Sequence, residues 1–176
     1  IHLAQKLGVP YVRVMATAPV PQPAGTVDEG YVQHRAVEMG HYALEHGVKM
    51  LIETNGVWSD SEKLARLMST IGCEGVGVLW DVHHPYRFMH ERPSVTLANL
   101  RPWLCHTHVK DSVATEDGYR YAMPGFGDLP LEEIVGTLKD GGYEGFYSLE
   151  WVKRWDMTLE EPGIVFAHYA NYMRTL

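Results

Sequence analysis

Short apolar stretches with strand character recur along the chain, and segments with helical spacing lie between them. The strand-like stretches are rich in β-branched or aromatic residues and are bounded by Gly, Pro or Asn; they cover residues 10–15, 49–54, 75–82, 104–111 and 145–152. The helix-like stretches cover residues 29–47, 59–72, 129–142 and 159–176. Strands that alternate with helices form βαβ units, so the sequence predicts a parallel sheet covered by helices.

The composition is that of a globular protein and argues against several other classes. The chain has 176 residues, of which 45% are hydrophobic and 21% charged, as in globular proteins. No apolar run is long enough to cross a membrane, and the first residues lack the basic and apolar regions of a signal peptide. We therefore expect a soluble, cytoplasmic protein with no membrane partner. The net charge of −7 argues against nucleic acid as a partner, because binding phosphates needs clustered Lys and Arg.

Four successive strand-like stretches end in a side chain that can bind a metal. These side chains are Glu53, Asp81, His108 and Glu150. Parallel α/β folds, and (β/α)8 barrels above all, place their active sites at the carboxyl ends of the strands. Buried acids there need a common partner, and three carboxylates with one imidazole suit a divalent cation. The sequence therefore predicts a metal site that joins the four strand ends.

Several motifs resemble one known family. They are IETNG at 52–56, the D-x-x-H of Asp81 and His84, HVKD at 108–111, PGFGDLPLEEI at 124–134 and GYEGFYSLEW at 142–151. In order and spacing they resemble the sugar phosphate isomerase/epimerase family, the xylose isomerase-like TIM barrels, which include D-tagatose 3-epimerase-like enzymes, hydroxypyruvate isomerase and inosose dehydratase. The resemblance implies one metal held by Glu53, Asp81, His108 and Glu150. It favours Mn²⁺, with Mg²⁺, Co²⁺ or Zn²⁺ as alternatives.

The number of strands is smaller than a closed barrel requires. A (β/α)8 barrel has eight strands and about 250 residues, whereas the chain shows only the five stretches above. The expected fold class is α/β, with residues 1–176 as a single domain that forms the C-terminal part of a TIM barrel, strands four to eight, and with the N-terminal part missing. Open strand edges tend to pair, so we expect another segment, another chain or a further copy in a homo-oligomer to cover them.

The predicted site suits proton abstraction next to a carbonyl. A metal that binds the carbonyl and a neighbouring hydroxyl of a sugar stabilises the resulting enediolate. By the resemblance, Glu53 and Glu150 are the catalytic residues, one removing the proton and the other returning it. The expected function is a metal-dependent sugar isomerase or epimerase of carbohydrate metabolism. The alternative is a dehydratase of an inosose or 3-dehydroshikimate type of ketone; an endonuclease IV-like nuclease and a non-catalytic sugar-binding protein are less favoured.

Substrate-binding residues are expected beside the ligands. The candidates are His84, Arg87, Lys110 and Trp151. The competing interpretations are a turn histidine, an exposed loop arginine and a core tryptophan. Lys110 and Asp111 either form a buried charge pair beside the metal or simply end the strand. The ketose epimerases of the family carry an arginine shortly after the ligand histidine, where this chain has Ala114; Arg120 is the nearest candidate, in an expected hairpin around Gly118. The substrate therefore stays open between a sugar and a cyclitol.

Overall fold

A sheet of five parallel strands organises the molecule. The computed structural model describes residues 1–17 and 27–176. The strands are β1 (Tyr11–Val14), β2 (Lys49–Glu53), β3 (Val76–Asp81), β4 (Leu104–Val109) and β7 (Tyr147–Leu149), and they neighbour one another in chain order. Each of the five expected stretches contains one of them. The sheet is the parallel part-barrel that the sequence predicts; that three further units precede it stays a prediction.

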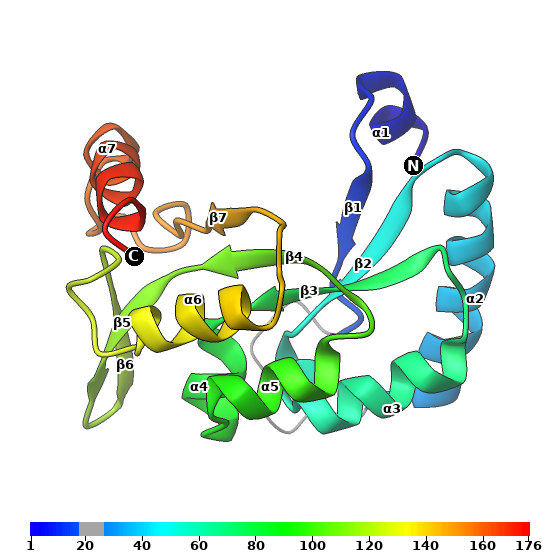
Figure 1. Ribbon diagram of the computed structural model, residues 1–176, viewed down its shortest axis with the longest axis horizontal. Coiled ribbons are helices and arrows are strands. Elements are labelled where there is room, and N and C mark those ends of the chain that lie inside the picture. Colours follow the sequence, from blue (N-terminus) through cyan, green and yellow to red (C-terminus); the bar gives the residue numbers. More distant parts are fainter. Residues whose placement is uncertain (18–26) are drawn as a thin grey trace.

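Helices cover one face of this sheet. They are α1 (His2–Leu7), α2 (Glu29–Glu45), the 3-10 helix η1 (Gly56–Ser59), α3 (Ser61–Ile71), α4 (His83–Met89), α5 (Pro93–Leu100), α6 (Leu131–Asp140) and α7 (Pro162–Met173). Figure 1 shows α2, α3, α5 and α6 along the same side of the sheet, with α1 and α7 near its two ends. No described helix is both long and apolar enough to cross a membrane.

Two hydrophobic clusters fill the space between the sheet and the helices. In the first, Ile52 and Val78 of the sheet pack with Leu64 and Met68 of α3. In the second, Trp80 of β3 packs with residues of α5 and α6. Successive side chains of a strand point to opposite faces, so this packing leaves Glu53 and Asp81 on the other, concave face. Trp80 therefore lies on the face that the helices cover.

Side-chain caps fix where the longer helices begin. The carboxylate of Asp28 accepts a hydrogen bond from the backbone N–H of Tyr31 at the start of α2, and that of Asp60 accepts one from Lys63 at the start of α3. Such caps satisfy backbone donors that have no partner inside the helix. Helix α3 ends at Gly72, which has φ 55°, a left-handed conformation that favours glycine. The two helices therefore lie where the sequence predicts them.

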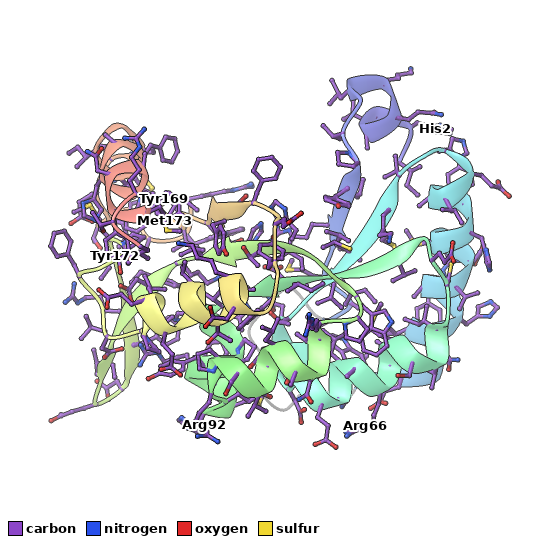
Figure 2. The ribbon with its side chains drawn as sticks, viewed as in Figure 1. His2, Arg66, Arg92, Tyr169, Tyr172 and Met173 are labelled. Atoms are coloured by element: carbon purple, nitrogen blue, oxygen red, sulfur yellow. The ribbon has the colours of Figure 1, made fainter. Side chains whose placement is uncertain are left out.

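An antiparallel hairpin and a loop follow the fourth strand. The hairpin strands are β5 (Asp111–Thr115) and β6 (Gly118–Ala122), which pair in a separate two-stranded sheet. This confirms the hairpin expected around Gly118. The loop after it is packed against α7, where Tyr172 lies close to Gly125, and Tyr169 donates a hydrogen bond to the carbonyl of Tyr147. Figure 2 labels both tyrosines on α7.

The segment between β3 and β4 differs from a simple turn. Strand β3 ends at Asp81 and α4 begins at His83, so a helix follows the strand after a single residue. A second short helix, α5, starts at Pro93, a residue that suits the first helical turn because it lacks only a donor that would be unpaired anyway. These two helices together form the crossover that connects the parallel strands.

Candidate metal site

The four predicted ligands converge at the carboxyl ends of four neighbouring strands. Each of Glu53, Asp81, His108 and Glu150 offers one ligand atom, and these atoms lie within 4.8 Å of one another. The strand pairing explains the convergence, since Asp81 lies directly opposite His108 in the register of β3 and β4. Glu53 and Asp81 are 0% exposed. The structure therefore brings together every ligand that the sequence predicts.

Two basic side chains neutralise this acidic cluster. Arg13 Nη1 donates to Glu53 Oε2 at 2.9 Å and to Glu150 Oε1 at 3.1 Å. Lys110 Nζ lies 2.6 Å from Glu150 Oε2 and 2.7 Å from Asp81 Oδ2. Each cation thus joins two carboxylates. Buried carboxylates require such compensation, because isolated charges are costly to remove from water.

The electrostatics of the cluster favour the ionised form of Glu53 and the charged form of Lys110. Burial raises the pKa of Glu53, but the hydrogen bond with His108 and the charge of Arg13 outweigh it and hold this pKa below its ordinary value. Burial likewise opposes the charged form of Lys110, and Asp81 with Glu150 nevertheless hold its pKa above the ordinary value. The shift of Glu53 follows mainly from a hydrogen bond to its charged form, and that of Lys110 from opposite charges placed within a few ångströms.

The donor set fits a divalent cation. Three carboxylates and an imidazole are hard oxygen and nitrogen ligands, which suit Mn²⁺, Mg²⁺, Co²⁺ or Zn²⁺. Within the described residues, the buried Oδ2 of Asp81 accepts no hydrogen bond of normal geometry, although the Lys110 ammonium lies 2.7 Å away. His108 Nδ1 lies 3.3 Å from Glu53 Oε1, so both face the same small space.

His84 lies beside the ligands as a neutral imidazole. Its Nδ1 is 2.6 Å from the carbonyl oxygen of Thr54, and because a carbonyl only accepts, Nδ1 carries the proton. Nε2 is then free of hydrogen and lies 3.8 Å from Asp81 Oδ2. Burial, followed by the nearby charge of Lys110, lowers the pKa of His84 to about 3. The ring therefore presents an uncharged acceptor to the site.

Thr54 connects two of the strand ends. Its Oγ1 accepts a hydrogen bond from the backbone N–H of Asp81 at 2.9 Å and donates to the carbonyl of Asp81 at 3.2 Å. Its own carbonyl accepts the hydrogen bond from His84. This threonine, fully buried directly after Glu53, aligns Asp81 and His84.

Lys110 and Asp111 do not pair with each other. Lys110 points into the metal site, whereas the Asp111 carboxylate accepts hydrogen bonds from the backbone N–H groups of Gly125, Gly127 and Leu129 in the following loop. The expected alternative of a charge pair is therefore wrong. Lys110 lies between the end of β4 and the start of β5, and the two side chains have separate partners.

Two of the predicted substrate-binding residues have structural partners. Arg87 forms an ion pair with Asp128 and donates to the carbonyl of Ser112 at 3.0 Å. The Nε1 of Trp151 donates to the carbonyl of Glu160 at 2.9 Å. These contacts fix the loops around the site. Of the four candidates, Lys110 and His84 are the ones in contact with, or beside, the ligands.

The concave face beneath the ligands carries further polar side chains. His106 lies one inward-facing position before His108, as strand alternation predicts, and its Nε2 is 2.9 Å from Ser148 Oγ. Both histidines line a cavity of about 320 Å³ together with Arg13, Tyr11 and apolar residues. The sequence did not single out Arg13 or Thr54. A charged residue between Val12 and Val14, on the inward side of an apolar strand, was the available signal for the arginine.

The comparisons with known proteins agree with this geometry. A sequence model of the xylose isomerase-like TIM barrel family matches residues 1–173. The fructoselysine 3-epimerase of Shigella flexneri is 22% identical over 182 aligned positions, which cover 100% of this chain and 63% of that protein. The chain thus spans less than two thirds of the length of this relative.

Two solved structures share the fold. The 3-keto-D-glucoside 4-epimerase of E. coli superposes with a TM-score of 0.73 at 18% identity, covering 98% of this chain and 66% of that one. A "probable 3-DHS dehydratase" of Bacillus anthracis, involved in petrobactin synthesis, gives a TM-score of 0.71 at 19% identity, covering 85% and 60%. With the match of the family model across nearly its whole length, the chain belongs to the xylose isomerase-like TIM barrels.

Proposed function

We propose that the four converging side chains hold one divalent metal ion and that the full-length protein is a metal-dependent sugar isomerase or epimerase. The observation that carries the proposal is the placement of one ligand atom from each of Glu53, Asp81, His108 and Glu150 within 4.8 Å of the others. The similarity to a fructoselysine 3-epimerase along the whole chain supports the same class of reaction. Membership of a fold family alone would not, because one fold serves many activities.

The cation would polarise the substrate carbonyl and so acidify the neighbouring C–H bond. A carboxylate-rich donor set suits Mn²⁺, our first choice, or Mg²⁺, whereas Zn²⁺ and Co²⁺ gain more from nitrogen and sulfur ligands. Because one Asp and two Glu contribute formal charge −3, a dication leaves the site close to neutral once Lys110 is included.

Glu53 and Glu150 would carry the proton transfers. One carboxylate removes the proton from the carbon next to the carbonyl, and the other, in its protonated form, returns a proton. The side chain of Glu150 is 24% exposed whereas that of Glu53 is fully buried, so the two reach the substrate from different environments. Return on the opposite face of the same carbon gives an epimer; return to the neighbouring carbon gives an isomer.

The substrate class is a small polyhydroxy ketone, a ketose or a cyclitol. Neutral His84 would accept a hydrogen bond from a hydroxyl through Nε2, since Nδ1 is occupied by Thr54. Lys110 would donate to substrate oxygens or fix Glu150. The ion pair of Arg87 with Asp128 and the hydrogen bond of Trp151 favour loop-stabilising roles for these two residues instead. We expect a cytoplasmic enzyme without nucleic acid partners.

The first experiment is metal analysis of the purified full-length protein. We expect about one divalent ion per chain, lost in Glu53→Gln/Asp81→Asn, because two buried ligands become neutral. The matched control is Glu144→Gln/Asp140→Asn, which makes the same chemical changes at exposed positions and should keep the ion. The proposal would be wrong if the protein bound no ion under any loading condition, or if Glu53→Gln/Asp81→Asn kept the ion.

The second experiment separates the reactions. Metal-loaded protein is incubated in D₂O with a panel of ketoses and inososes and with 3-dehydroshikimate. Isomerisation or epimerisation incorporates solvent deuterium at the carbon next to the carbonyl, which mass spectrometry detects. Loss of water without such a product would instead assign the dehydratase alternative. Absence of both in a metal-loaded protein would favour a sugar-binding role.

A further inference from the structure

Arg13 lies between the two proposed catalytic glutamates. It belongs to β1, at the edge of the sheet, and it pairs in register with Leu51, two residues before Glu53. From there its Nη1 reaches up to Glu53 Oε2 at 2.9 Å and Glu150 Oε1 at 3.1 Å. A single nitrogen therefore bridges two carboxylates from strands β2 and the end of β7, which are separated in the sheet by two other strands. A metal ion would bridge the same two residues.

Lys110 makes a similar bridge in a very different setting. Its side chain is 4% exposed and lies between Asp81 and Glu150. The side chain of Arg13 is 41% exposed, and the same residue lines the cavity of about 320 Å³ on the concave face. Arg13 thus has space to move away from the glutamates, whereas Lys110 is enclosed by protein.

We propose that Arg13 competes with the divalent cation for Glu53 and Glu150, and that metal binding displaces its guanidinium into the adjoining cavity. The proposal rests on the metal site proposed above. Two cations held by the same two carboxylates repel each other strongly at such short distances. The one that can leave at least cost is the exposed arginine, because moving Lys110 would leave an unpaired buried charge.

Arg13 is thus a positioning residue: it occupies the two glutamates when no metal is bound, and it thereby lowers the affinity of the site for the metal. Without it, the metal-free cluster keeps three carboxylates against one ammonium. That state gains more from a dication than the wild-type cluster does. Removal of Arg13 should therefore tighten metal binding, while removal of an arginine that only supports the ligand geometry would weaken it.

The test is a calorimetric titration of Mn²⁺ into the metal-free full-length protein. Arg13→Met should bind Mn²⁺ at least about tenfold more tightly than wild type. Arg13→Lys, which keeps a cation able to bridge both glutamates, should stay within about threefold of wild type. The matched control is Arg66→Met, which changes the net charge equally; Arg66 pairs with Glu62 on α3, on the helix side of the molecule (Figure 2).

A second measurement distinguishes competition from simple structural support. In the metal-free protein, Arg13→Met should lower the melting temperature, because Glu53 and Glu150 lose a partner. With saturating Mn²⁺ this deficit should disappear or reverse, since a ligand stabilises a folded state in proportion to its affinity. A purely structural arginine would give the same deficit with and without metal.

The outcomes separate this proposal from the metal site itself. Equal or weaker Mn²⁺ binding by Arg13→Met, with wild-type binding that depends on Glu53 and Asp81, overturns the competition and leaves the metal site standing. Tighter binding by both Arg13→Met and Arg66→Met also overturns it, because net charge alone would then account for the change. If neither wild type nor Arg13→Met binds Mn²⁺, both proposals fail.

Discussion

Glu150 holds three partners at once, which makes it the most informative single residue of the site. Arg13 and His108 lie near its Oε1 and Lys110 near its Oε2. Glu150→Gln keeps the size of the side chain but removes the base, so we expect turnover to fall by at least about a hundredfold. Steady-state kinetics measures the loss, and a cooperative melting transition shows that the fold persists. Glu144→Gln, at an exposed position, is the control; full activity in Glu150→Gln would exclude this residue from proton transfer.

His83 links the fold to pH. The residue is completely buried against the rings of Phe88 and Tyr119, and its Nε2 is 3.0 Å from Ser112 Oγ. Burial lowers its pKa to about 3. In the unfolded chain the pKa is about 6.5. Above about pH 6.5 the imidazole of His83 is neutral in both the folded and the unfolded state, and stability is complete. As the pH falls toward 3, the unfolded chain binds a proton at His83 that the folded state does not, so the free energy of unfolding decreases.

We predict that the free energy of unfolding depends less steeply on pH when this imidazole is removed. His83→Phe should reduce the slope of the free energy of unfolding against pH by up to about 1.4 kcal/mol per pH unit between pH 6 and 4. Urea unfolding in the presence of a chelator measures it. Loss of the hydrogen bond to Ser112 lowers the free energy of unfolding by the same amount at every pH. The slope against pH therefore still reports the protonation of the imidazole. His41→Gln, at an exposed histidine of α2, should leave the slope as in wild type; an unchanged slope in His83→Phe would contradict the argument.

At this scale the sequence predicted which side chains converge at the strand ends, but not what surrounds them. A strand-end rule and motif spacing identify Glu53 and His108, because backbone geometry alone sends consecutive parallel strands to one edge. The partner of a long flexible side chain is decided by tertiary packing. Arg87 pairs with Asp128, forty-one positions along the chain, and spacing gives no sign of it. For the same reason, no pattern in the sequence indicated that Arg13 contacts Glu53 and Glu150.

Among the elements, β4 contains a local irregularity that affects which of its side chains point toward the site. The pairing of β3 with β4 shifts between Val78 and Leu79, so that Cys105 is an extra residue in β4. Such a bulge changes which positions face inward and is frequent beside active sites. The thiol of Cys105 lies close to Gly77, where an added Cβ would come within 2.7 Å of Sγ. No sequence pattern predicted the bulge, because it follows from the fit between two strands.

The loop after β6 depends on Asp111. Its carboxylate accepts backbone hydrogen bonds from Gly125 at 2.9 Å and Gly127 at 3.0 Å. A Cβ at Gly127 would lie 2.0 Å from Asp111 Oδ1. Gly127→Ala should therefore displace the carboxylate and lower the free energy of unfolding by about 2–3 kcal/mol, because buried donors lose their acceptor. Chemical denaturation measures the change.

A glycine of the neighbouring helix supplies the control. In α6, a Cβ at Gly136 would meet nothing within 4 Å. Gly136→Ala should raise the free energy of unfolding by about 0.5–1 kcal/mol, because alanine is the better helix former. Opposite signs for the two Gly→Ala changes would support a specific clamp at Asp111. Equal effects would show that the loop tolerates movement of the carboxylate.

The short helices α4 and α5 mark the limit of prediction by periodicity. Each has fewer than nine residues, and prolines interrupt the segment that contains them. Helical spacing needs about three turns to become distinctive. The longer α2 and α3, with their Asp caps, were located from the sequence. The short ones are stabilised by packing, for instance of Leu97 and Leu100 beneath the sheet, which a local pattern does not contain.

The whole molecule is a sheet with two edges and a concave face. Strands β1 and β7 each have a strand neighbour on one side only within the described residues. The number of parallel strands could be predicted, because each βα unit has its own apolar stretch. What covers the concave face could not, since sequence patterns identify elements rather than their outer partners. The chain spans 63% of the length of the fructoselysine 3-epimerase of Shigella flexneri that it matches.

Exposed apolar side chains at these edges give the last prediction. Phe146, just before β7, is 76% exposed and Tyr11 of β1 is 37% exposed; both line the cavity of the concave face. Open edges and contiguous apolar surface favour association. We expect the 176-residue chain, produced by itself, to self-associate at micromolar concentration.

Charge placed on this face should reduce the association. Tyr11→Lys/Phe146→Lys should shift sedimentation toward the monomer, because a charged edge resists pairing with another copy. Tyr31→Lys is the matched control, since Tyr31 is 64% exposed on α2, away from the concave face; it should sediment as the unmodified chain does. A monomeric unmodified chain, or an equal effect of Tyr31→Lys, would show that the concave face does not drive association. A selective effect would show that this face drives the association of the chain.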